Sequence, residues 1–131
     1  MIDLTDRDVF ECMLSTKVAE GKYVDLHNEY NFISVDFNYP EKIARFIFRH
    51  IKHGNQVVLM FQETSIERLF LNMEDKEGAD TLDLFYRGKF LLNGLLLEKS
   101  DERGSYFYLS FYNGSEYEIF SKKVLLILNK D

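Results

Sequence analysis

The stretch that decides the fold lies near the C-terminus, where residues 106–120 read YFYLSFYNGSEYEIF. Aromatic and aliphatic residues on both sides of the Asn-Gly pair at 113–114 predict two strands joined by a tight turn. Two registers compete. A two-residue loop would place Leu109 opposite Glu118 and would put glutamates among the apolar side chains. We expect the alternative, a three-residue loop whose glycine takes the left-handed bulge position, which places Leu109 opposite Tyr117.

This register divides the predicted hairpin into two chemically different faces, because successive side chains of a strand point to opposite sides. Tyrosine offers apolar area together with a hydroxyl, and glutamate matches lysine or arginine on a basic target. We therefore expect a partner-binding surface at Tyr106, Tyr108, Glu116 and Glu118. The alternative is that a helix or a neighbouring strand covers this face. The opposite, apolar face carries Phe107, Leu109, Phe111, Tyr117 and Ile119.

Upstream and downstream of the hairpin the chain is rich in further strand signals. Short connections between these segments favour antiparallel pairing. The predicted strands are Tyr23–His27, Phe32–Phe37, Val57–Phe61, Ile66–Met73, Leu82–Tyr86, Phe90–Leu97 and Val124–Leu128.

Two segments in the N-terminal half predict helices. The first runs from Thr5 to about Gly21, where a capping pattern precedes apolar residues at helical spacing. The second runs from Pro40 to Lys52 or His53, after Asn38 as a cap. The predicted fold class is therefore α+β, with both helices covering one face of a mainly antiparallel, curved sheet of about 6–9 strands.

The second predicted helix separates cationic from apolar side chains. Ile43, Ile47 and Ile51 would face the sheet. The opposite stripe is a candidate anion-binding site, or it is simply the solvated face of an amphipathic helix. Its cations are Lys42, Arg45, Arg49 and Lys52.

Composition indicates one domain spanning residues 1–131, with 12 Phe and 8 Tyr to fill a core. The formal net charge of −6 opposes binding to nucleic-acid backbones and anionic membranes, so we expect neither as a partner. Cys12 is the single cysteine, and no secretion signal or membrane-spanning run is recognisable. These features favour a cytoplasmic protein.

Patterns that carry catalysis or cofactor binding are missing from the sequence. It contains no phosphate loop, no dinucleotide-binding glycine pattern, no nucleophile elbow and no zinc-protease motif. His50 and His53 have a spacing that suits a metal pair, but no third ligand is evident nearby. The acidic loop 74–80 does not have the spacing of a calcium-binding loop. We therefore predict no catalytic residue, no metal and no cofactor.

These observations favour a small binding protein, most of all an inhibitor or immunity-type protein that neutralises a basic protein such as a toxin. The rival hypothesis is a small-ligand-binding domain or enzyme with an apolar, aromatic-lined pocket. Nucleic-acid binding through the basic helix is a third hypothesis, against which the net charge argues. An exposed strand edge would also allow pairing with a second copy of the chain.

Overall fold

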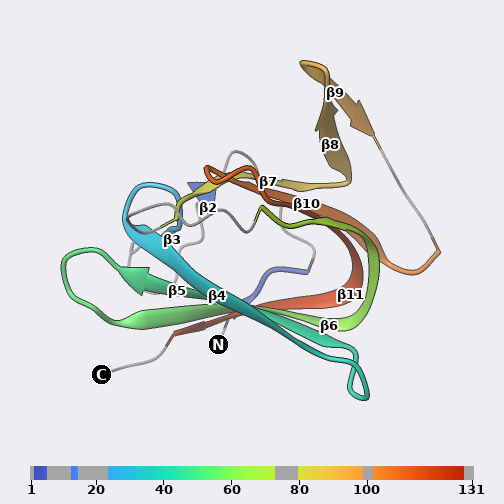
Figure 1. Ribbon diagram of the computed structural model, residues 1–131. Coiled ribbons are helices and arrows are strands. Elements are labelled where there is room, and N and C mark those ends of the chain that lie inside the picture. Colours follow the sequence, from blue (N-terminus) through green and yellow to red (C-terminus); the bar gives the residue numbers. More distant parts are fainter. Residues whose placement is uncertain (1, 6–12, 15–23, 73–79, 99–101, 129–131) are drawn as a thin grey trace.

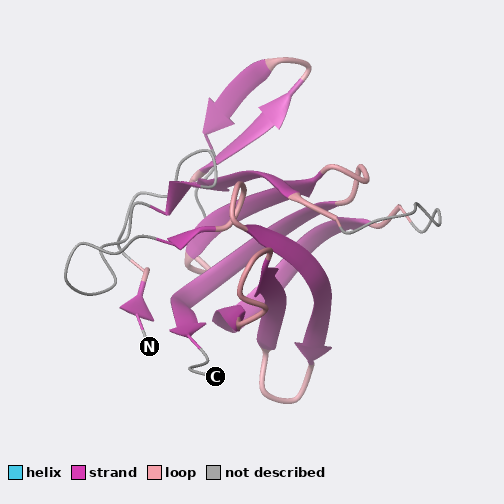
Figure 2. Ribbon diagram, turned by 90° about the vertical axis from the view of Figure 1, so that its left-hand side faces the viewer, coloured by secondary structure: helices cyan, strands magenta, loops and turns pink. Residues whose placement is uncertain are grey.

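The computed structural model describes residues 2–5, 13–14, 24–72, 80–98 and 102–128. In these ranges the chain forms strands and no helix, and Figures 1 and 2 show a curled sheet from which one hairpin projects. The strands are β1 (Ile2–Asp3), β2 (Met13–Leu14), β3 (Val24–Asp25), β4 (Tyr30–Asn38), β5 (Ile43–His50), β6 (Gln56–Phe70), β7 (Leu82–Arg87), β8 (Lys89–Leu92), β9 (Leu95–Glu98), β10 (Ser105–Phe111) and β11 (Glu116–Leu128).

The main sheet has seven strands, in the order β4-β5-β6-β11-β10-β7, with β1 also paired to β11. All of these pairs are antiparallel. The two outer edges approach each other where the Phe32 N–H donates to the Asp80 carbonyl at 2.9 Å. The sheet therefore curls around a single interior, as Figure 1 shows.

Aromatic rings fill this interior. Phe46 on β5 contacts Phe61 on β6 and Tyr117 on β11, with ring centroids 5.5 and 5.0 Å apart. Phe61 in turn lies 5.3 Å from Phe107 on β10. Burying such a side chain contributes about 1.5–3 kcal/mol, so the ring cluster is a main source of stability. It also joins the consecutive strands β5 and β6 to β10 and β11, which lie far from them in the sequence.

The second predicted helix is wrong, because its residues form strand β5 between β4 and β6. Ala44, Phe46 and Phe48 are fully buried in the core, whereas Ile51, predicted to be buried, is exposed. The run IARFIFRH has apolar residues at both the helical and the strand spacing. Periodicity alone could not distinguish the two structures.

The apparent helix start at Asn38 and Pro40 belongs to the turn between β4 and β5. The side chain of Asn38 accepts the backbone N–H of Glu41 through Oδ1 at 3.3 Å, much as a helix cap would. The chain then reverses direction, because Lys42 has a φ of 57° and its N–H donates to the Tyr39 carbonyl at 3.3 Å. Asparagine side chains make the same local hydrogen bond in turns.

The predicted α+β class is therefore also wrong, since the described part of the chain is all sheet. Most of the first predicted helix, from Thr5 to about Gly21, lies outside the described residues. Met13–Leu14, inside that segment, forms β2 and pairs with β3. The antiparallel, curved character of the predicted sheet agrees with the structure.

Several predicted strands have different bounds in the structure. The segments 57–61 and 66–73 lie mainly on the single strand β6, which bends where Glu63 has a φ of 48°. Likewise, 117–120 and 124–128 both belong to β11. The predicted strand Phe90–Leu97 is instead the hairpin β8–β9.

The predicted register of the C-terminal hairpin is confirmed. Leu109 lies opposite Tyr117, and Gly114 has a φ of 94°. Phe107, Phe111 and the other residues assigned to the apolar face belong to the main core. The remaining face of β10 and β11 is therefore the outer face, on which the predicted binding residues lie.

Candidate functional site

The four residues of the predicted partner-binding face come together on β10 and β11, joined by an arginine of β6. The Tyr106 hydroxyl donates to Glu118 Oε1 at 2.6 Å, and the Tyr108 hydroxyl donates to Glu116 Oε1. Arg68 donates from Nε to Glu118 Oε2 at 2.7 Å and from Nη2 to Glu116 Oε2 at 3.1 Å. One guanidinium thus joins both tyrosine–glutamate pairs. We call these five residues the Tyr–Glu–Arg network.

Most of this network is buried within the chain. The exposed fraction is 1% for Tyr106, 4% for Tyr108 and 9% for Glu118. Burial, followed by the hydrogen bond to a glutamate, raises the pKa of both tyrosine hydroxyls well above its ordinary value. They therefore remain protonated donors at neutral pH. Contact with a partner stays a prediction for this face, on which Arg68 and Glu116 are the more exposed side chains.

A second arginine covers the adjoining part of the outer face. The guanidinium of Arg103 lies 4.1 Å from the centre of the Phe120 ring, and its Nη2 is 2.9 Å from Glu67 Oε2. Phe120 forms a small apolar cluster with Tyr86, Tyr106 and Tyr108. Arginine over an aromatic face is a favourable contact. The outer face of β10 and β11 is thus partly covered by side chains from other parts of the same chain, such as Arg103.

The four predicted anion-binding residues do not form one stripe. Lys42 lies in the β4–β5 turn and Lys52 in the β5–β6 turn, at opposite ends of β5. Arg45 and Arg49 share the outer side of that strand, on which Ile47 separates them. Arg45 pairs with Asp36 at 3.4 Å. The four cationic side chains are therefore spread along β5 and its flanking turns, whereas a helix would have placed them close together on one face.

His50 and His53, whose spacing would suit a metal pair although no metal was predicted, stack on each other with ring centroids 4.6 Å apart. His50 Nδ1 accepts the backbone N–H groups of Lys52 and His53, both at 3.1 Å, so this nitrogen is occupied. His50 Nε2 lies 3.6 Å from Glu29 Oε2. Among the described residues no group of three His, Cys, Asp or Glu side chains could hold a metal ion.

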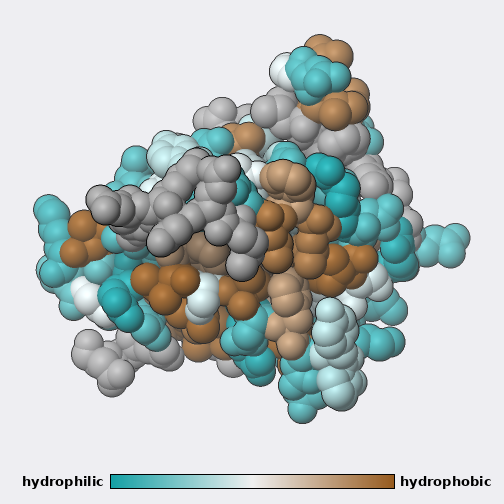
Figure 3. Space-filling view, in the orientation of Figure 1, coloured by the Kyte–Doolittle hydropathy of each residue, from teal (hydrophilic) through white to brown (hydrophobic). Residues whose placement is uncertain are grey.

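The hairpin β8–β9 exposes apolar side chains well away from the sheet. It forms a separate two-stranded sheet and projects from the body in Figures 1 and 2. Figure 3 shows hydrophobic side chains at its end. Its turn is an Asn-Gly pair in which Asn93 and Gly94 have φ values of 50° and 78°. The exposed leucines are Leu92, Leu95, Leu96 and Leu97.

No protein family, curated protein or solved structure compared with this chain matches it. Its own surface and cavities therefore carry the evidence for what it does. In the part of the chain that the structure describes, no helix is long and apolar enough to cross a membrane.

Two features escaped prediction from sequence. Arg68 lies 50 residues from Glu118 along the chain, and nothing local to either residue indicates that they meet. The hairpin β8–β9 did carry a signal, because an Asn-Gly pair between apolar runs is the usual mark of a two-residue turn. The exposure of the four leucines could not be predicted from the sequence, because leucine-rich strands usually pack against a core.

Proposed function

We propose that this chain is a small protein-binding module of the inhibitor or immunity type, which docks onto a basic protein through the hairpin β8–β9. The observation that supports this proposal most is the row of exposed leucines on a projecting hairpin. Leu95 alone is 66% exposed. Apolar side chains gathered in this way commonly mark an interaction site, because docking removes them from water.

The geometry of the hairpin also suits a protein partner better than a small ligand. A two-stranded hairpin is only marginally stable in water by itself, so a partner that adds contacts would stabilise it. Within the described residues β8 and β9 pair only with each other, which leaves backbone groups on both outer edges for an incoming strand. A convex, projecting element fits into a groove of its partner.

Charge supports the basic nature of the proposed partner. The net charge of −6 produces a negative field that attracts a cationic protein and raises the rate of encounter. The leucines then provide the uncharged contact that holds the complex. A cytoplasmic location belongs to this proposal and is supported by the single cysteine, Cys12.

Affinity capture from the source cell, with identification by mass spectrometry, tests the proposal. We expect the wild-type chain to retain one stoichiometric partner of basic isoelectric point. The double variant Leu95→Ser/Leu96→Ser should lose it. Leu71→Ser is the matched control, since Leu71 is 45% exposed but lies outside the hairpin. Equal capture by the hairpin variant and the wild type would refute the docking role of β8–β9.

A further inference from the structure

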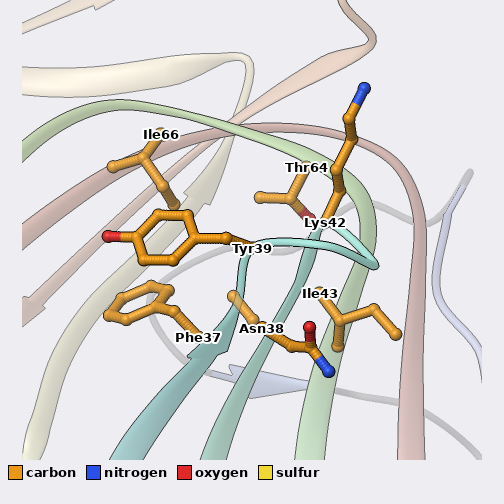
Figure 4. A pocket seen from close by; sticks show the side chains of 8 residues that line it. Phe37, Asn38, Tyr39, Lys42, Ile43, Thr64 and Ile66 are labelled. Atoms are coloured by element: carbon orange, nitrogen blue, oxygen red, sulfur yellow. The ribbon is translucent and has the colours of Figure 1, made fainter.

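A pocket of about 240 Å³ lies between the β4–β5 turn and the bend of β6. Figure 4 shows it from close by: the Tyr39 ring lies next to Ile66, Phe37 forms the wall below, and the ammonium of Lys42 points away from the cavity. Its lining residues are Phe37, Asn38, Tyr39, Lys42, Ile43, Ala44, Thr64 and Ile66. This pocket is remote in sequence from the hairpin of the proposed function.

The walls of the pocket are mostly apolar. Two residues at its rim have an unusual backbone conformation. Lys42 and Glu63, on the turn and at the bend, both have left-handed φ values, of 57° and 48°. The N–H of Thr64 donates to the Lys42 carbonyl at 3.0 Å, which ties the two sides together. Non-glycine residues in this conformation are uncommon and often accompany functional sites.

Thr64 contributes an unusual polar group. Its Oγ1 is buried and has no hydrogen-bond partner among the described residues. Buried hydroxyls nearly always have one, because an unpaired group has lost its bonds to water. A rotation about χ1 that turned this hydroxyl toward a ligand would therefore break no hydrogen bond to the described residues. A ligand oxygen would thus pair with a hydroxyl that has no hydrogen-bond partner among the described residues.

Among the described residues that line the pocket, Lys42 is the only charged one. Within the described residues no carboxylate pairs with it. Its four-carbon stem is flexible, so the ammonium could swing back over the pocket mouth toward an anionic group. The size of the cavity limits the apolar part of the ligand. An apolar cavity of about 150 Å³ accommodates benzene, so this pocket matches a body of roughly two fused rings.

We propose that this pocket binds a small aromatic carboxylate, whose ring system lies between Phe37, Tyr39 and Ile66 and whose carboxylate meets Thr64 and Lys42. The aromatic and aliphatic walls recognise the rings. The Thr64 hydroxyl donates to one carboxylate oxygen, and the Lys42 ammonium provides the opposite charge. This site is independent of the hairpin β8–β9 and of any protein partner.

The probe for this site is 2-naphthoate, which carries two fused rings and one carboxylate. Binding to the full chain is followed by calorimetry and by NMR shifts of backbone amides. We expect saturable binding in the submillimolar range, with shifts centred on the β4–β5 turn and on the bend of β6. The neutral probe 2-naphthalenemethanol should bind more weakly, and 2-naphthylmethylamine, a cation, more weakly still.

Three variants separate binding from folding. Thr64→Val should weaken 2-naphthoate binding about tenfold, the value of one hydrogen bond to a charged group, while the unfolding midpoint stays equal or rises. Lys42→Gln should weaken it about threefold, because an exposed charge pair contributes little. Lys52→Gln, at the other end of β5, should bind as the wild type does. The hairpin variant Leu95→Ser/Leu96→Ser should also bind normally, which keeps this test separate from that of the proposed function.

Three results would overturn the proposal. One is the absence of saturable binding by 2-naphthoate at millimolar concentration. Another is a preference for the cationic probe over the anionic one. The third is unchanged 2-naphthoate affinity in the Thr64→Val variant.

Discussion

At the scale of single residues, the Tyr106 hydroxyl connects β10 to the Glu118 carboxyl of β11, which Arg68 also contacts. Tyr106→Phe should lower the free energy of unfolding by about 1–3 kcal/mol, since the Glu118 carboxyl would lose one hydrogen-bond donor in a buried position. Urea unfolding measures the change. Tyr112→Phe is the control, because Tyr112 is 61% exposed, and its effect should remain within about 0.5 kcal/mol. Equal effects of the two substitutions would contradict the importance of the network.

Another prediction at this scale concerns pH. Burial, with a smaller effect of Asp80, raises the pKa of Tyr117 to about 12, against about 10 for an unfolded chain. Because the folded pKa is the higher one, the stability from this difference is fully present below about pH 10 and is lost as the pH rises toward 12. The loss from one such tyrosine approaches about 1.4 kcal/mol per pH unit within that window.

Unfolding free energies of the wild type and of Tyr117→Phe between pH 8 and pH 11 measure this effect. The variant should lose stability less steeply above pH 10, since it has one titrating group fewer. Parallel curves for the two proteins would show that Tyr117 ionises as readily in the folded chain as in the unfolded one.

At the scale of elements, strand β5 buries the side chains of one face in the core and leaves those of the other face more exposed. Phe46 is fully buried, whereas Ile51, just after the strand, is 56% exposed. Phe46→Ala should therefore cost about 3–5 kcal/mol, and Ile51→Ala less than about 0.5 kcal/mol. Denaturant unfolding of both variants is the measurement. The reverse order, with Ile51 the costly position, would support the helix that the sequence suggested.

At the scale of the whole molecule, the charge of −6 predicts how association with the proposed basic partner depends on salt. Raising the salt concentration from 0.05 to 0.5 M should slow association by about tenfold or more, because the screening length falls below about 10 Å. Dissociation should change much less, since uncharged leucine contacts hold the complex. Stopped-flow or surface-based kinetics with the captured partner measures both rates. Salt-independent association would argue against a basic partner.

Local chemistry in the sequence determined the C-terminal hairpin, including its register. The Asn-Gly pair marks the position of the turn, and of the two registers compared only one keeps Glu118 away from the apolar residues around Leu109. The sequence also determined that Tyr106 and Glu118 share a face. Each of these conclusions depends on neighbours in one hairpin, for which alternation of side chains is a strict geometric rule.

The tertiary structure alone decided the remaining features, because they depend on residues far apart in the chain. The segment IARFIFRH fits both a helix and a strand, and it became β5 because β4 and β6 pair with its two edges while Phe46 and Phe48 enter a shared core. The polar side chains on the outer face of β10 and β11 bond to one another within the chain, because Arg68 of β6 hydrogen-bonds to both glutamates of that face. Hydrogen bonding between strands and burial against distant side chains are properties of the assembled sheet, so local periodicity could not predict them.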